Sequence, residues 1–236
     1  LWAMQSGNLQ PDELRRALQI ASRVGSDHDK ANLLIETSAI GLKPQLRRDF
    51  FYAAGTIASD YDRRRVVAKA MQDAPDDPEV TVLVGRVVEK MQSDHDKAEI
   101  LKQVPYEDIA NDVNARQSIL RAIASIQSDH DKSRALAKIL DNNEIEPQVL
   151  AHVIRVIEDI QSDSDKSRLL AQVTPQAIGG VPARSAFFAA VRTIHSDNDR
   201  ARVLVGLLGQ KDLSAETVEE ICISAKSIGA DNEKAN

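Results

Sequence analysis

Residues 59–71 read SDYDRRRVVAKAM, in which a serine, two aspartates and a basic residue precede an apolar pattern. The word Ser-Asp-x-Asp-Lys/Arg that opens this stretch recurs along the chain. Its serines are Ser26, Ser59, Ser93, Ser128, Ser162 and Ser196, and residues 230–234 (ADNEK) form a degraded further copy. The steps between copies are 33, 34, 35, 34, 34 and 34 residues. This regular period predicts a repeat array in which each unit buries its apolar face against its neighbours.

The motif is typical of a helix start. The Ser59 hydroxyl can accept a hydrogen bond from the Asp62 amide, and the Asp62 carboxylate can reach back to the Ser59 amide, as in a capping box. Both aspartates lie where the helix dipole favours negative charge. The apolar residues that follow at helical spacing are Val66, Val67, Ala70 and Met71. Each copy therefore predicts the first helix of a repeat.

A second helix is expected before each following serine. Proline stands in its first turn at Pro11, Pro44, Pro78 and Pro147. Two residues before each motif the chain has Val24, Ile57, Met91, Ile126, Ile160, Ile194 and Ile228. Nine residues before it the chain has Ala17, Phe50, Val84, Ile119, Val153, Phe187 and Ile221. These apolar positions predict the packed face, and the short connection to the next serine predicts an antiparallel neighbour.

The pattern predicts an all-α fold, an α/α solenoid (superhelix) of about six antiparallel helix pairs with half-repeats at both ends. The expected helices are 11–24, 26–39, 44–57, 59–72, 78–91, 93–103, 112–126, 128–140, 147–160, 162–173, 182–194, 196–208 and 214–228. We expect residues 1–236 to form a single helical-repeat domain. The chain begins without Met and ends inside a repeat, which indicates a fragment of a longer array.

Composition narrows the functional classes. The apolar content of 42% and charged content of 28% are typical of a folded domain, and the net charge of −6 disfavours nucleic-acid and membrane-surface partners. No apolar stretch is long enough to span a membrane, so this segment is not expected to insert into one. Cys222, the single cysteine, cannot form an intramolecular disulfide, and we expect it to be a small buried hydrophobic residue.

The aspartates and histidines that could suggest a metal or catalytic site are explained by their positions in the repeat. The paired aspartates lack the glycine and closing glutamate of a calcium loop. His28, His95 and His130 fall at equivalent positions of different repeats, about 10 Å apart by helix packing, which is too far to share a zinc ion. The basic residue of each motif is expected to be exposed and to pair with an aspartate of an adjacent repeat. The sequence therefore predicts no enzyme, with no catalytic residue, metal or cofactor.

The exposed face of the second helices varies from repeat to repeat, and we call its position seven residues before each motif the variable slot. Its residues are Gln19, Tyr52, Arg86, Arg121, Arg155, Ala189 and Ile223. The three consecutive arginines are expected to form a basic stripe on the second helices, which Arg48 and Tyr52 extend. The alternative is a solvated face on which the arginines bind nothing. These five residues are the candidate binding site.

The tight turn with an aspartate followed by a basic residue resembles HEAT repeats. The SDxDK word followed by two aliphatic residues is also similar to helical repeats appended to bacterial antibiotic-sensing membrane metallopeptidases and related envelope proteins. This resemblance implies a bacterial, extracytoplasmic sensor or scaffold region, although a cytoplasmic location stays open. We expect a non-enzymatic scaffold that binds an acidic protein or peptide. The alternatives are a nucleic-acid-binding solenoid with a basic groove and, more distantly, an enzyme whose site the sequence does not display.

Overall fold

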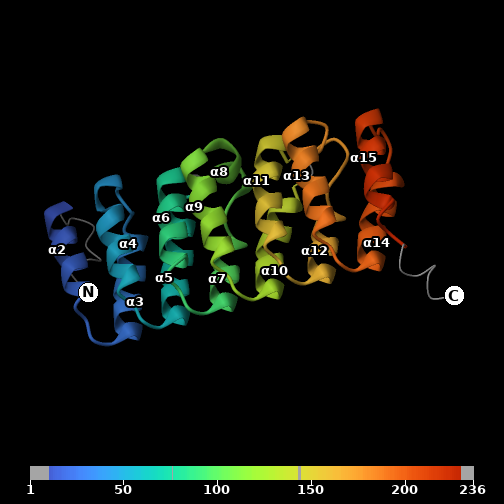
Figure 1. Ribbon diagram of the computed structural model, residues 1–236. Helices are drawn as coiled ribbons and strands as arrows, with labels where there is room; N and C mark the ends of the chain where they lie inside the picture. The colour runs from blue at the N-terminus through green and yellow to red at the C-terminus, as the bar shows by residue number, and fades with distance from the viewer. Residues whose placement is uncertain (1–10, 76, 143–144, 230–236) are drawn as a thin grey trace. The chain divides into compact units, whose positions relative to one another are not determined.

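The computed structural model describes residues 11–75, 77–142 and 145–229. Within these ranges the chain consists of helices and their connections without any strand, which confirms the all-α class. Two compact units can be distinguished, unit 1 ending at Ile126 and unit 2 beginning at Gln127. Each unit is a stack of helix pairs (Figure 1), so the chain has the helical-repeat solenoid fold.

Unit 1 is built from two rows of helices (Figure 1). The first helices of its repeats are α3 (Asp27–Ala39), α5 (Asp60–Asp73) and α7 (Asp94–Leu101). The second helices are α2 (Pro11–Ala21), α4 (Arg47–Gly55), α6 (Pro78–Val88) and α9 (Val113–Ala124), and the 3-10 turn η1 (Pro44–Leu46) precedes α4. First helices pack on first helices and second helices on second helices, and the two rows contact each other.

Unit 2 repeats this arrangement. Its first helices are α10 (Asp129–Leu140), α12 (Asp163–Leu170) and α14 (Asp197–Leu208). Its second helices are α11 (Pro147–Glu158), α13 (Val181–Arg192) and α15 (Ala215–Ala225). Helices α10, α12 and α14 pack in one row, and α11, α13 and α15 pack in the other.

The expected helix starts are confirmed at six motifs. Each motif serine caps its helix by accepting a hydrogen bond, 3.2 or 3.3 Å long, from the amide three residues later. The seventh copy of the motif lies outside the described residues. Pro78 and Pro147 occupy the expected first turns of α6 and α11, whereas Pro44 lies in η1 just before α4. The starts of the first helices therefore follow from local capping chemistry.

The expected packed face is also confirmed. Ile57, Ile126, Ile160 and Ile194, two residues before successive motifs, are completely buried. Phe50, Val84, Ile119, Val153 and Phe187, nine residues before, are completely buried as well. Towards the two ends of the described chain, Ala17, Val24 and Ile228 are only half-buried. Burial of these side chains between adjacent helix pairs is the main force that holds the stack together.

The first aspartate of the motif joins one repeat to the next. One carboxylate oxygen of Asp27 accepts hydrogen bonds from the amides of Ala58 and Ser59, at 3.0 and 2.8 Å. Asp60, Asp129 and Asp163 make the same pair of bonds to the following turn, at 2.6 to 3.0 Å. The serine amide is thus bound by the preceding repeat, not by the second aspartate of its own motif as the capping-box prediction had it.

The motif lysine was wrongly expected to be exposed and to pair across repeats. Lys30, Lys97, Lys132 and Lys166 are all buried. The ammonium of Lys30 donates to the Thr56 carbonyl at 3.1 Å, and that of Lys97 donates to the Ser125 carbonyl at 2.9 Å. These carbonyls lie at the ends of second helices, where the helix dipole favours a cation. The lysine is buried because its ammonium finds partners there and its stem covers apolar surface.

The aspartate and the lysine of one motif therefore clamp the same turn. The Asp163 carboxylate binds the amides of His195 and Ser196, and the Lys166 ammonium lies 2.8 Å from the Thr193 hydroxyl. Burial alone would raise the pKa of Asp163, but the two backbone amides outweigh it and hold this pKa below its usual value. Burial lowers the pKa of Lys166, against the opposing attraction of Asp163. The lowered pKa keeps Asp163 ionised at neutral pH.

Two local features differ from expectation. A short helix, α8 (Tyr106–Asn111), precedes α9, where the sequence analysis placed only a connection. The buried Arg116 guanidinium holds the end of α8 by donating to the carbonyls of Ile109 and Ala110, at 2.9 and 3.0 Å. Cys222 is exposed, contrary to the prediction of a buried residue. Its neighbour Ile221 faces the core, and one helical step turns Cys222 away from it.

Candidate binding surface

The variable slot lies on the surface of the second helices. Tyr52, Arg86, Arg121 and Arg155 are exposed, and Ala189 is half-buried. All five line hollows between consecutive second helices. Tyr52 and Arg86 line the hollow between α4 and α6, and Arg86 and Arg121 line the hollow between α6 and α9. Arg155 and Ala189 line the hollow between α11 and α13. These five slot residues therefore lie where the surface is concave.

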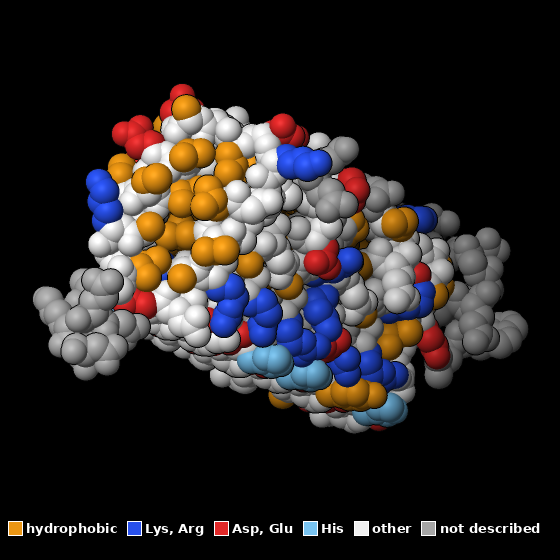
Figure 2. All heavy atoms as spheres, turned by 90° about the vertical axis from the view of Figure 1, so that its right-hand side faces the viewer, with side chains coloured by type: hydrophobic (Ala, Val, Ile, Leu, Met, Phe, Trp, Pro, Cys, Tyr) orange, Lys and Arg blue, Asp and Glu red, His pale blue; other side chains and the backbone are white. Residues whose placement is uncertain are grey.

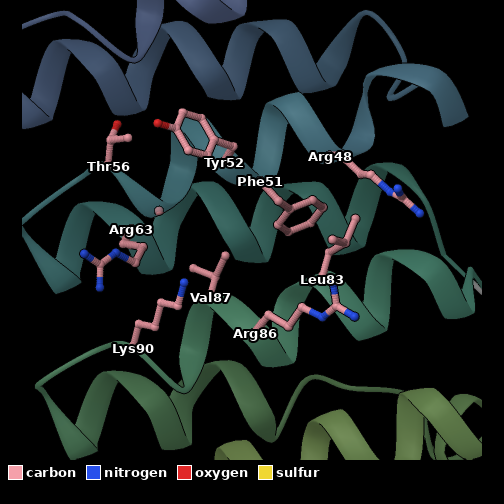
Figure 3. A pocket seen from close by; sticks show the side chains of 10 residues that line it. Arg48, Phe51, Tyr52, Thr56, Arg63, Leu83, Arg86, Val87 and Lys90 are labelled. Carbon is pink, nitrogen blue, oxygen red and sulfur yellow. The ribbon is translucent and has the colours of Figure 1, made fainter.

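The hollow between α4 and α6 combines an apolar floor with a basic rim (Figure 3). It has a volume of about 390 Å³. Phe51, Leu83 and Val87 form the floor, and the exposed ring of Tyr52 stands at the side. Phe51 is fixed by an edge-to-face contact with Phe50, with ring centroids 5.4 Å apart. We call this space the α4–α6 hollow.

Basic side chains form the rim of the α4–α6 hollow. Arg48 lies near one end in Figure 3, and Arg63 and Lys90 lie towards the other. Arg63 is occupied, because its guanidinium binds the Ile57 carbonyl and the Asp60 carboxylate. Arg48 is 87% exposed, and its Nε atom lies 3.9 Å from Glu79. No aspartate or glutamate lines this hollow among the residues that the structure describes.

The hollow between α6 and α9 is more polar. It has a volume of about 450 Å³ and contains Arg86 and Arg121 together with the carboxylates of Glu79 and Asp112. The Asp112 carboxylate caps α9 by accepting from the Ala115 amide at 2.8 Å. Since both acids are part of the site, a bound anion would meet repulsion as well as attraction here.

Unit 2 has its own hollow of about 430 Å³ between α11 and α13. Arg155 lines it beside Glu158, and Val181 and Pro182 of α13 form the opposite side. The predicted stripe therefore consists of two groups, with Arg48, Tyr52, Arg86 and Arg121 on the second helices of unit 1 and Arg155 on α11 of unit 2.

The arginines of the slot are not used by the fold. Across the described ranges, the guanidinium groups of Arg86, Arg121 and Arg155 make neither a hydrogen bond nor an ion pair, and the ammonium of Lys90 makes none either. The arginines of the first helices behave differently, because Arg65 and Arg134 each pair with the aspartate three residues earlier in their own motif. Unpaired guanidinium groups keep their full capacity to bind carboxylates.

A further exposed surface lies on α14 and α15. Figure 2 shows hydrophobic side chains gathered on the side of unit 2 that carries these helices. Their large exposed hydrophobic residues are Val205, Leu208, Val218 and Ile223. Leu140 stands at the same repeat position as Leu208 and is buried, so this face is of the kind that an adjacent repeat covers.

The histidines of the motif are solvent-exposed side chains. His28, His95 and His130 each stand on the surface of a different first helix. In the part of the chain that the structure describes, no group of three or more His, Cys, Asp or Glu side chains could hold a metal ion. Within the same ranges, no helix has the length and apolarity needed to cross a membrane.

The sequence analysis identified the slot but missed the apolar floor of the α4–α6 hollow. Phe51, Leu83 and Val87 read as ordinary apolar residues of amphipathic helices, and Lys90 reads as a solvated lysine. One signal was present: Leu83, Val87 and Lys90 lie three or four residues from Arg86 or from one another, so they share a helix face with the slot.

Comparisons with protein-family models, with curated proteins and with solved structures found no match.

Proposed function

We propose that this chain is a non-enzymatic helical-repeat scaffold that binds an acidic protein or peptide along its second helices. The observation that carries this proposal is the position of Arg86, Arg121 and Arg155. They line hollows between second helices, and the fold leaves their guanidinium groups unpaired within the described residues. Helical-repeat proteins bind partners through extended surfaces of this kind.

The charge distribution favours an acidic partner. The chain has a net charge of −6, yet the slot presents arginines in three consecutive repeats. Arg86 and Arg121 line one hollow of unit 1, and their guanidinium groups can bind carboxylates with charge-assisted hydrogen bonds, as that of Arg155 can in unit 2. The resemblance of the SDxDK motif to repeats of bacterial envelope proteins supports a role as a scaffold or sensor module of such a protein.

Charge reversal of Arg86, Arg121 and Arg155 to glutamate tests this function. We expect the triple variant to lose measurable binding to a glutamate-rich peptide and to keep its helicity, because the three side chains point away from the core. Fluorescence anisotropy of the labelled peptide measures the affinity, and circular dichroism measures the helicity.

The matched control reverses Lys138, Lys211 and Lys226 to glutamate, which changes the net charge by the same amount. These lysines are exposed and line none of the three hollows. Equal affinity of both variants and the wild type would contradict the proposal. Tighter, steeply salt-dependent binding of duplex DNA, lost in the arginine variant alone, would favour the nucleic-acid alternative instead.

A further inference from the structure

The α4–α6 hollow has the composition of a receptor for one aromatic side chain. Its floor of Phe51, Leu83 and Val87 is apolar, and Tyr52 adds an aromatic wall that is 73% exposed. Its volume of about 390 Å³ lies within the range of about 300 to 1,000 Å³ in which proteins bind small groups. An aromatic ring gains most from such a site, because it buries a large area and packs edge-to-face on Phe51 or Tyr52.

The rim determines the charge of the segment that carries this ring. Arg48, Arg86 and Lys90 surround the floor, and no acid lines the hollow within the described chain. A cation near the face of a bound ring adds attraction, and carboxylates next to the ring can pair with the same cations. Resting on the proposed function, we infer that the α4–α6 hollow binds an aromatic anchor residue flanked by acidic residues in the partner segment.

The neighbouring hollows lack this combination. Glu79 and Asp112 belong to the hollow between α6 and α9, and Glu158 belongs to the hollow between α11 and α13. The anchor is therefore expected in the α4–α6 hollow, and acidic residues after it extend over Arg86 towards Arg121.

Gly55 gives a way to fill the hollow without changing a charge. It is the last residue of α4 and lines the hollow, and a Cβ atom built on it would meet nothing within 4 Å. Because its Cβ position is open and Gly55 lines the hollow, we expect a leucine here to fit and to occupy part of the space that the anchor needs. Gly206 in α14 is the matched control, because its Cβ position is equally open and it lines none of the three hollows.

The experiment measures peptide affinity by fluorescence anisotropy for the wild type, Gly55→Leu and Gly206→Leu. The probes are two glutamate-rich peptides that differ only in a central tryptophan or serine. We expect the tryptophan peptide to bind the wild type roughly tenfold or more tightly than the serine peptide, as burial of a large apolar side chain predicts. Gly55→Leu removes this difference, and Gly206→Leu preserves it. Thermal unfolding verifies that both variants are folded.

The outcomes separate this inference from the proposed function. If both peptides bind equally, or if Gly55→Leu preserves the preference for tryptophan, the α4–α6 hollow is not the anchor site. The arginine charge reversal can still abolish binding in that case, and the scaffold function then stands without this site. Failure of both peptides to bind the wild type overturns the inference and the proposed function together.

Discussion

The first aspartate of the motif has a structural role, because its charged carboxylate stabilises the contact between adjacent repeats. Asp163 binds the amides of His195 and Ser196, which begin the next repeat. Hydrogen bonds to a charged acceptor are worth about 1.5 to 3 kcal/mol, more than bonds between neutral groups. The first aspartate is thus committed to backbone amides, whereas the second pairs with an arginine of its own helix, as Asp62 does with Arg65. The lysine of the same motif binds the turn that the first aspartate binds.

Asp163→Asn tests the contribution of this charge through pH. Because the folded-state pKa of Asp163 is lowered, the ionised group stabilises the fold above its unfolded pKa of about 3.9, and this stability is lost as pH falls through the folded pKa. We expect the variant to lose about 1 kcal/mol of unfolding free energy at pH 7, and the difference from wild type to shrink below about pH 4. Urea unfolding across this pH range measures it. A gap that stays constant into acid, or a gap equal to that of the exposed-residue control Asp141→Asn, would contradict the assignment.

Helices α6 and α9 are in close contact at Gly85. A Cβ atom on Gly85 would lie 2.4 Å from the Ser118 hydroxyl oxygen and 2.8 Å from the Ser118 carbonyl carbon. The Ser118 hydroxyl donates to the Val82 carbonyl at 2.8 Å, so side chain and backbone of α9 are both held against α6. Between α4 and α6, the larger residues Phe51 and Tyr52 line an open hollow instead.

Gly85→Ala is therefore expected to destabilise the protein although alanine is the better helix former. The propensity gain of about 1 kcal/mol is outweighed by a clash with backbone that cannot rotate away, and overpacking of this kind costs about 1 to 3 kcal/mol. Gly206→Ala is the control of opposite sign, because its Cβ meets open space within α14 and only the propensity gain remains. Thermal and urea unfolding of both variants measure the effects. Stabilisation by Gly85→Ala would show that α6 and α9 can separate at little cost.

Local chemistry explains which parts of the structure the sequence could predict. Serine caps, first-turn prolines and apolar spacing act within one helix, so helix positions and the buried Phe50 and Phe187 follow directly from the pattern. Burial of Lys30 depends on how one helix pair is rotated against its neighbour. The spacing of residues within a helix does not determine this angle, so the burial could not be predicted. Helix α8 depends on Arg116, seven residues after Ile109, which supplies the cap that its own six residues lack. The floor of the α4–α6 hollow depends on the gap between two helices, which the sequence pattern does not specify.

Unit 1 and unit 2 each contain one phenylalanine pair in the same repeat position. Phe50 and Phe51 in α4 make an edge-to-face contact with centroids 5.4 Å apart, and Phe187 and Phe188 in α13 make one at 5.2 Å. Phe50 and Phe187 both stand nine residues before a motif serine and are both completely buried. The two residues are therefore equivalent probes of how stability is distributed along the array.

Phe50→Ala and Phe187→Ala should each weaken mainly the unit that contains the change. Loss of a buried phenylalanine costs about 3 to 5 kcal/mol through lost burial and the cavity left behind. In a repeat array stability is a sum of terms for single repeats and for adjacent pairs, so this cost falls on neighbouring helices first. Hydrogen exchange measured by mass spectrometry should show faster exchange in α2 to α6 for Phe50→Ala, while α12 to α15 keep their protection. Phe187→Ala should give the reverse pattern, with loss centred on α11 to α15. Equal loss of protection in every helix for both variants would mean that the chain unfolds as one cooperative body and that the repeat contacts are strong enough to override local stability.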